Sequence, residues 1–73
     1  MSKIRLVICI DNEGYPASLE RRKIYQVVPD QGAESAGQIR VIDESGEDYL
    51  YPASCFVEAN LSDDIVAAVV RVA

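Results

Sequence analysis

The chain has 73 residues and a mass of 8.0 kDa, which matches one small domain and excludes a two-domain protein. Hydrophobic residues (49%) and charged residues (26%) occur at ordinary globular levels, so the composition argues against a disordered or low-complexity chain. The net charge of −5 opposes general binding to nucleic-acid phosphates. With no His and only two Cys, the chain lacks the ligands of an ordinary zinc site and an imidazole for catalysis.

The first predicted strand, residues 3–10, alternates along its length, which is typical of an extended segment. One face carries Ile4, Leu6, Ile8 and Ile10, and the other carries Lys3, Arg5, Val7 and Cys9. A loop follows over residues 11–22, because its Asn, Gly and Pro residues interrupt the strand pattern. We expect Tyr15 and Leu19 in this loop to fold back onto the sheet.

The second predicted strand covers residues 23–28, with Tyr25 and Val27 on one face, and Pro29 ends it. Residues 30–37 are polar and contain two glycines, so they predict a flexible connection with one helical turn at residues 33–36.

A β-hairpin is predicted over residues 37–52. Two strand-like runs, residues 39–43 and 47–51, surround Glu44-Ser45-Gly46, and a glycine at this place is typical of a bulged turn. The acidic residues of this turn are interpreted as a water-facing hairpin tip: Asp43, Glu44, Glu47 and Asp48. Pro52 ends the hairpin, residues 53–55 predict one 3₁₀ turn, and Phe56 and Val57 resume a short strand.

The C-terminal segment changes to a helical period. Ser62 is a candidate helix cap, and the spacing of Ile65, Val69 and Val72 predicts a helix over residues 63–71. Because Val lowers helix propensity, a sixth strand remains the alternative.

The order of these elements resembles the Src-homology-3 (SH3) family. Its most specific stretch is residues 49–57, Tyr-Leu-Tyr-Pro-Ala-Ser-Cys-Phe-Val, which is similar to the Pro-containing ending of that family. The chain also resembles short uncharacterised bacterial and phage SH3-like proteins at residues 9–14, 23–27 and 43–52. The resemblance implies an all-β, five-stranded SH3-like barrel with a short C-terminal α-helix, and it implies no particular activity. We assign residues 1–60 to the barrel and residues 61–73 to a helix or tail of the same domain.

The leading functional hypothesis is an interaction module that binds a protein or peptide segment through acidic loops and tyrosines. The chain has no Trp for the groove of proline-rich ligands, and Cys55 occupies the position of the groove Tyr. The remaining candidates for partner contact are Asp11, Glu13, Tyr15, Tyr49, Tyr51 and Pro52. Among the aromatic residues, Tyr25, Tyr49, Tyr51 and Phe56 are expected to fill the core or its rim, and Tyr15 is the best exposed candidate.

The alternative hypothesis is a homodimer formed through the C-terminal helix, whose apolar residues exceed what one small domain can cover. The candidate residues are Ile65, Val66, Val69, Val70 and Val72. Nucleic-acid binding ranks below both hypotheses, and no catalytic residues, metal ligands or cofactors are expected.

The apolar run of residues 6–10 is shorter than a signal-peptide core and than a membrane span. We therefore expect a cytoplasmic protein without membrane contact and with two reduced thiols. Cys9 is expected to be buried and Cys55 to be more accessible.

Overall fold

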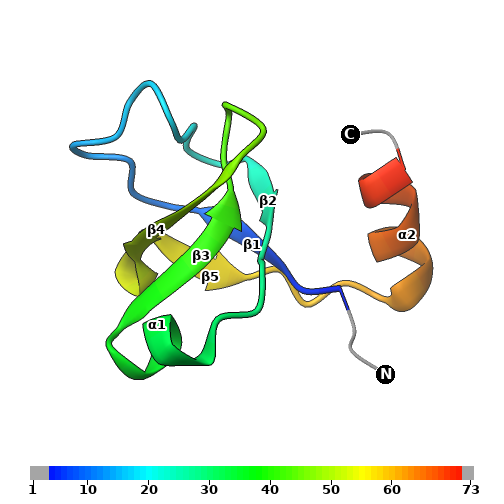
Figure 1. The fold of residues 1–73 in the computed structure, drawn as a ribbon. Coiled ribbons are helices and arrows are strands. Elements are labelled where there is room, and N and C mark those ends of the chain that lie inside the picture. Colours follow the sequence, from blue (N-terminus) through cyan, green and yellow to red (C-terminus); the bar gives the residue numbers. More distant parts are fainter. Residues whose placement is uncertain (1–3, 72–73) are drawn as a thin grey trace.

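Two small antiparallel sheets organise the chain in the computed structural model, which describes residues 4–71 (Figure 1). The elements are β1 (Leu6–Cys9), β2 (Ile24–Gln26), α1 (Gln31–Ser35), β3 (Gln38–Ile42), β4 (Asp48–Pro52), the 3₁₀ helix η1 (Ala53–Cys55), β5 (Phe56–Glu58) and α2 (Asp63–Arg71). One sheet has the order β2-β1-β5, and the other consists of β3 and β4.

The two sheets meet where β2 runs on toward β3. Val27 forms an isolated antiparallel bridge with Val41, and the backbone N–H of Val28 donates to the carbonyl of Arg40 at 2.8 Å. Within residues 4–71, no strand pairing closes the sheets into a barrel, since η1 separates β4 from β5 and these two strands do not pair. The five predicted strands are confirmed, but the molecule combines strands with two α-helices and is not an all-β domain.

Helix α1 replaces most of the flexible connection that the polar composition predicted. Asp30 caps it, because its Oδ1 accepts a hydrogen bond from the N–H of Ala33 at 3.0 Å. The other carboxylate oxygen of Asp30 accepts from Arg40 Nε of β3 at 2.9 Å. These contacts order five residues that have few apolar side chains of their own.

The core lies between the two sheets and is built from alternate residues of the strands. In β1 the inward face is the one with Val7 and Cys9, which are 1% and 0% exposed. The buried cluster contains Val7, Cys9, Leu19, Tyr25, Val27, Ile39, Val41, Tyr51, Cys55 and Phe56. The expected accessibility of Cys55 is therefore wrong, because η1 turns its side chain into this core.

The first loop folds back onto the sheets as expected. Leu19 is fully buried, and Tyr15 is half-buried and packs against the core. Asn12 fixes the loop across its width, since its Nδ2 donates to the carbonyl of Leu19 at 3.1 Å.

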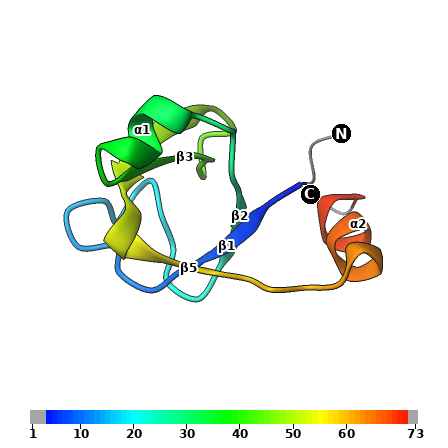
Figure 2. The same ribbon diagram turned by 90° about the horizontal axis from the view of Figure 1, so that it is seen from below.

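Helix α2 has the predicted bounds, so the alternative of a sixth strand is wrong. The helix lies beside one end of the β2-β1-β5 sheet and away from the rest of the molecule (Figures 1 and 2). None of its described side chains is buried. Val72, one of the predicted self-association residues, lies outside the described residues. Within residues 4–71, no helix has the length and apolar character needed to cross a lipid bilayer.

Candidate functional site

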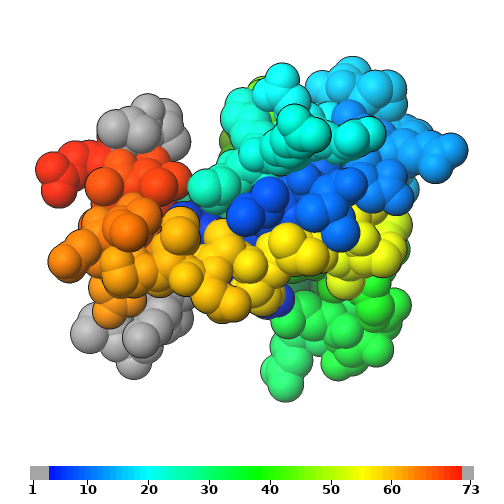
Figure 3. Space-filling view, turned by 180° about the vertical axis from the view of Figure 1, so that it is seen from behind, coloured from blue at the N-terminus to red at the C-terminus, as the bar shows by residue number. Residues whose placement is uncertain are grey.

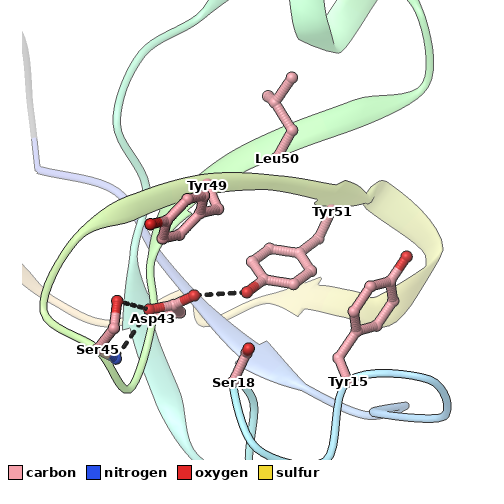
Figure 4. A pocket seen from close by; sticks show the side chains of 7 residues that line it. All are labelled: Tyr15, Ser18, Asp43, Ser45, Tyr49, Leu50 and Tyr51. Atoms are coloured by element: carbon pink, nitrogen blue, oxygen red, sulfur yellow. Dashed lines mark hydrogen bonds between the residues drawn. The ribbon is translucent and has the colours of Figure 1, made fainter.

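A shallow groove of about 430 Å³ lies between the first loop and the β3–β4 hairpin (Figure 4). It is lined by Tyr15 and Ser18 of the loop, and by Asp43, Ser45, Tyr49, Leu50 and Tyr51 of the hairpin. The groove thus joins two segments that lie about thirty residues apart in the sequence, and three of its seven residues are tyrosines.

Tyr15 and Tyr51 form one wall of the groove. Their rings meet edge to face, with centroids 5.0 Å apart and an interplanar angle of 89°. Tyr51 is 4% exposed and also packs edge to face on Phe56 in the core. Because Tyr51 is held by the core, it fixes the ring of Tyr15 at the surface.

Asp43 forms the base of the groove and is 7% exposed. Its Oδ2 accepts a hydrogen bond from the Tyr51 hydroxyl at 2.5 Å (Figure 4). Its Oδ1 accepts from the backbone N–H and the hydroxyl of Ser45, at 2.8 and 2.5 Å. Burial raises the pKa of the carboxyl group, but the hydrogen bonds from Ser45 and Tyr51 outweigh burial and hold the pKa below its ordinary value. Asp43 is therefore an ionised carboxylate that organises the hairpin.

Tyr49 supplies the exposed aromatic surface of the site. Its side chain is 50% exposed, in contrast to the expected place in the core or its rim. Tyr49 and Tyr51 lie on the same side of β4, since alternate residues of a strand share a face, whereas Leu50 points away from them (Figure 4). The Tyr49 hydroxyl donates to Glu47 Oε1 at 3.3 Å. The negative charge of Glu47 is the main cause that raises the pKa of Tyr49.

The charge around the groove is negative. Asp43 is the one ionisable carboxylate among the lining residues, Glu47 contacts Tyr49, and no Lys or Arg within residues 4–71 lines the groove. A ligand with a cationic side chain therefore meets favourable charge here, and phosphate groups meet repulsion.

Three of the six predicted contact residues come together in this groove: Tyr15, Tyr49 and Tyr51. Asp11 and Glu13 do not line it. The Oδ1 of Asp11 accepts the backbone N–H of Glu13 at 3.0 Å, so Asp11 shapes the tip of the loop. Pro52 also lies outside the groove, at the end of β4, where it precedes η1.

Sequence reasoning missed the other lining residues, above all Asp43, which was interpreted as part of a solvated tip. One signal pointed to its burial: Asp43 continues the alternation of Ile39 and Val41, which face the core. The Ser45 hydroxyl at i+2 then satisfies the carboxylate locally. Ser18 and Leu50 carry no comparable signal.

Both oxygens of Asp43 already accept hydrogen bonds, from the Tyr51 hydroxyl and from Ser45, so this carboxylate is engaged in holding the hairpin. Among residues 4–71, no group of His, Cys, Asp and Glu has the arrangement of a metal site. The chain matches no family model, and no similar curated protein or solved structure is found.

Proposed function

We propose that the protein is a non-catalytic interaction module with an SH3-like arrangement, and that its tyrosine groove binds an extended peptide segment with a basic residue. The strand order supports this interpretation: β5, β1 and β2 form one sheet, and the Val27–Val41 bridge leads from β2 to the β3–β4 hairpin. The groove lies between the first loop and this hairpin, the two segments that the interaction-module hypothesis assigns to partner contact.

The observation that carries the proposal is the Tyr15–Tyr51 pair, with the exposed Tyr49 beside it, above an ionised and buried Asp43. Flat aromatic faces bind the apolar side of an extended peptide, and they attract Arg or Lys through their π-electrons. Glu47, bonded to Tyr49, adds a negative charge at the same place. The ligand we propose is therefore an extended, apolar segment that contains Arg or Lys.

The groove is shallow and lacks a Trp wall, so we expect weak and reversible binding, with dissociation constants on the order of 10–100 µM. We place this module in the cytoplasm. The two free and buried thiols, Cys9 and Cys55, support that compartment.

Titration of the ¹⁵N-labelled protein with a library of extended peptides tests the proposal. We expect the amide shifts to cluster at residues 15–18 and 43–51 with basic peptides, and to disappear when Arg and Lys are replaced by Glu. Shifts that are scattered over the molecule, or equal for basic and acidic peptides, would refute it.

A further inference from the structure

The outer face of the β2-β1-β5 sheet is apolar, although it is turned away from the core. Ile8 of β1 lies opposite both Ile24 of β2 and Val57 of β5, so one row of branched apolar side chains crosses all three strands. Val57 is 46% exposed, and Ile10, which follows β1, is 52% exposed. When one face of an antiparallel sheet is in contact with water, that face normally carries polar side chains. The outer face of this sheet carries apolar side chains, which is typical of a covered surface.

Helix α2 extends the same surface at one end of the sheet. Figure 3 shows this side of the molecule, with β1 between β2 and β5 and with α2 beside them. A cleft of about 360 Å³ between helix and sheet has Leu6, Leu61 and Val66 among its lining residues. Ile65 on α2 is 50% exposed. We define the outer apolar face as Ile8, Ile10, Ile24 and Val57 of the sheet, together with the exposed Ile65 of the neighbouring helix.

We propose that the outer apolar face binds a second copy of this chain and forms a two-fold homodimer. Charge is the first argument for this occupant. The chain carries a net charge of −5, so two copies repel each other wherever acidic residues meet. The outward and accessible positions of the three strands are uncharged: Ile8, Ile24, Gln26 and Val57. Leu6 lies on the same side of β1 but is buried, with 4% exposure.

Charged groups that flank the three strands are paired within one chain, whereas none of the ion pairs within residues 4–71 involves Asp11 beside Ile10 or Asp63 and Asp64 beside Ile65. Lys23 Nζ lies 2.7 Å from Glu44, and Arg5 is bonded to Glu58 and, at 3.0 Å, to Glu34. The row of outward strand residues therefore offers no charge for recognition of a basic or acidic partner, and two identical copies can pair through this row without placing like charges against each other.

Area is the second argument. A stable interface needs about 800 Å² from each partner. This area is about a sixth of the 5108 Å² surface of the chain. The molecule has extents of 33 × 25 × 20 Å, and one of its broad sides provides a surface of that size. In a two-fold pair each residue contributes twice, so even a small apolar face gains from self-association. None of the five residues lines the tyrosine groove, which stays open in the dimer.

Sedimentation equilibrium of the full chain, from about 5 µM to 1 mM, tests the inference. We expect a mass that rises from 8.0 kDa toward twice that value with concentration. We also expect tighter pairing at higher salt, because screening weakens the repulsion between the two acidic copies. A mass that stays at 8.0 kDa at 1 mM would overturn the proposal.

The variants Val57→Lys and Ile65→Lys place a charge on the sheet part and the helix part of the face. For Val57→Lys we expect the dimer dissociation constant to rise by about a hundredfold, since the charge appears twice at the interface. The matched control is Leu50→Lys, because Leu50 is 40% exposed on another edge strand and lies outside the face. Unchanged dimerisation in both face variants would refute the proposal.

Dilution of the ¹⁵N-labelled wild-type chain tests the same interface without a substitution, so it remains informative if a variant does not fold. Concentration-dependent amide shifts at residues 8, 24 and 57 are expected, and shifts confined to residues 43–51 would contradict this interface. Failure of the dimer proposal can be distinguished from failure of the peptide-binding proposal. We expect folded Val57→Lys to bind basic peptides as the wild type does, and we expect Leu50→Lys to dimerise as the wild type does.

Discussion

The hydroxyl of Tyr51 donates a hydrogen bond of 2.5 Å to the carboxylate of Asp43, across the base of the β3–β4 hairpin. The bond joins a buried ring of the core to a buried charge at the hairpin turn. The same ring meets Tyr15 of the first loop, and the backbone N–H of Glu44 donates to the carbonyl of Ser18 at 3.0 Å, so these two contacts set the position of the loop against the hairpin.

Replacement of Asp43 by Asn removes the charge and puts an amide donor among groups that already donate. We expect Asp43→Asn to lower the free energy of unfolding by about 1–3 kcal/mol, since a buried hydrogen bond to Tyr51 or Ser45 is lost. Urea denaturation measures this change. The control is Glu13→Gln on the exposed first loop, with an expected change within about 0.5 kcal/mol. Equal effects of the two substitutions would contradict the structural role of Asp43.

The stability of the protein is expected to fall in acid, and Asp43 contributes to the fall. Its pKa is lower in the folded protein than the value of about 3.9 in an unfolded chain, so the folded state binds fewer protons. Its contribution is therefore complete above about pH 5, and it is lost as the pH falls below 3.9 through the folded pKa. Denaturation curves from pH 7 to pH 2 measure this, and Asp43→Asn is expected to have a smaller slope than the wild type. An unchanged slope would show that other carboxylates cause the whole acid dependence.

Tyr49 tests the surface part of the groove without disturbing the core. We expect Tyr49→Ala to weaken peptide binding by about tenfold, and to change the free energy of unfolding by less than about 0.5 kcal/mol, because half of the side chain is exposed. Tyr49→Phe keeps the ring and loses the contact with Glu47. Calorimetric titration of the two variants separates stacking from hydrogen bonding: near-normal affinity of Tyr49→Phe supports stacking, and equal loss in both variants contradicts it.

Leu19 anchors the first loop, and its truncation is expected to loosen the loop wall of the groove. Its side chain is completely buried, so Leu19→Ala is expected to cost about 2–5 kcal/mol. Thermal denaturation and the amide spectrum of residues 11–22 measure the effect. Leu50→Ala is the control, because Leu50 is 40% exposed and we expect its loss to be small. A loss below 1 kcal/mol for Leu19→Ala would show that the loop packs independently of this residue.

The strands and the C-terminal helix were predictable because each is dictated by local rules. Each of these signals depends only on residues a few positions away in the sequence. They are the alternation in residues 4–10, Gly46 after a short polar turn, and the acidic residues at the start of residues 63–71. The sequence also predicted that the first loop folds back onto the sheets, because Leu19 is a large apolar residue in a polar segment.

The sequence alone determined the number of strands, the hairpin, the 3₁₀ turn and helix α2, together with the acidic balance of the chain. Tertiary structure decided which tyrosines meet and where the charges lie. The hydrogen bonds of Asp30 stabilise a helix that composition does not favour, and those of Tyr51 and Ser45 let Asp43 be buried as a carboxylate. Such contacts join residues that are distant in the chain or depend on burial, and burial is a property of the folded packing, which local spacing does not specify.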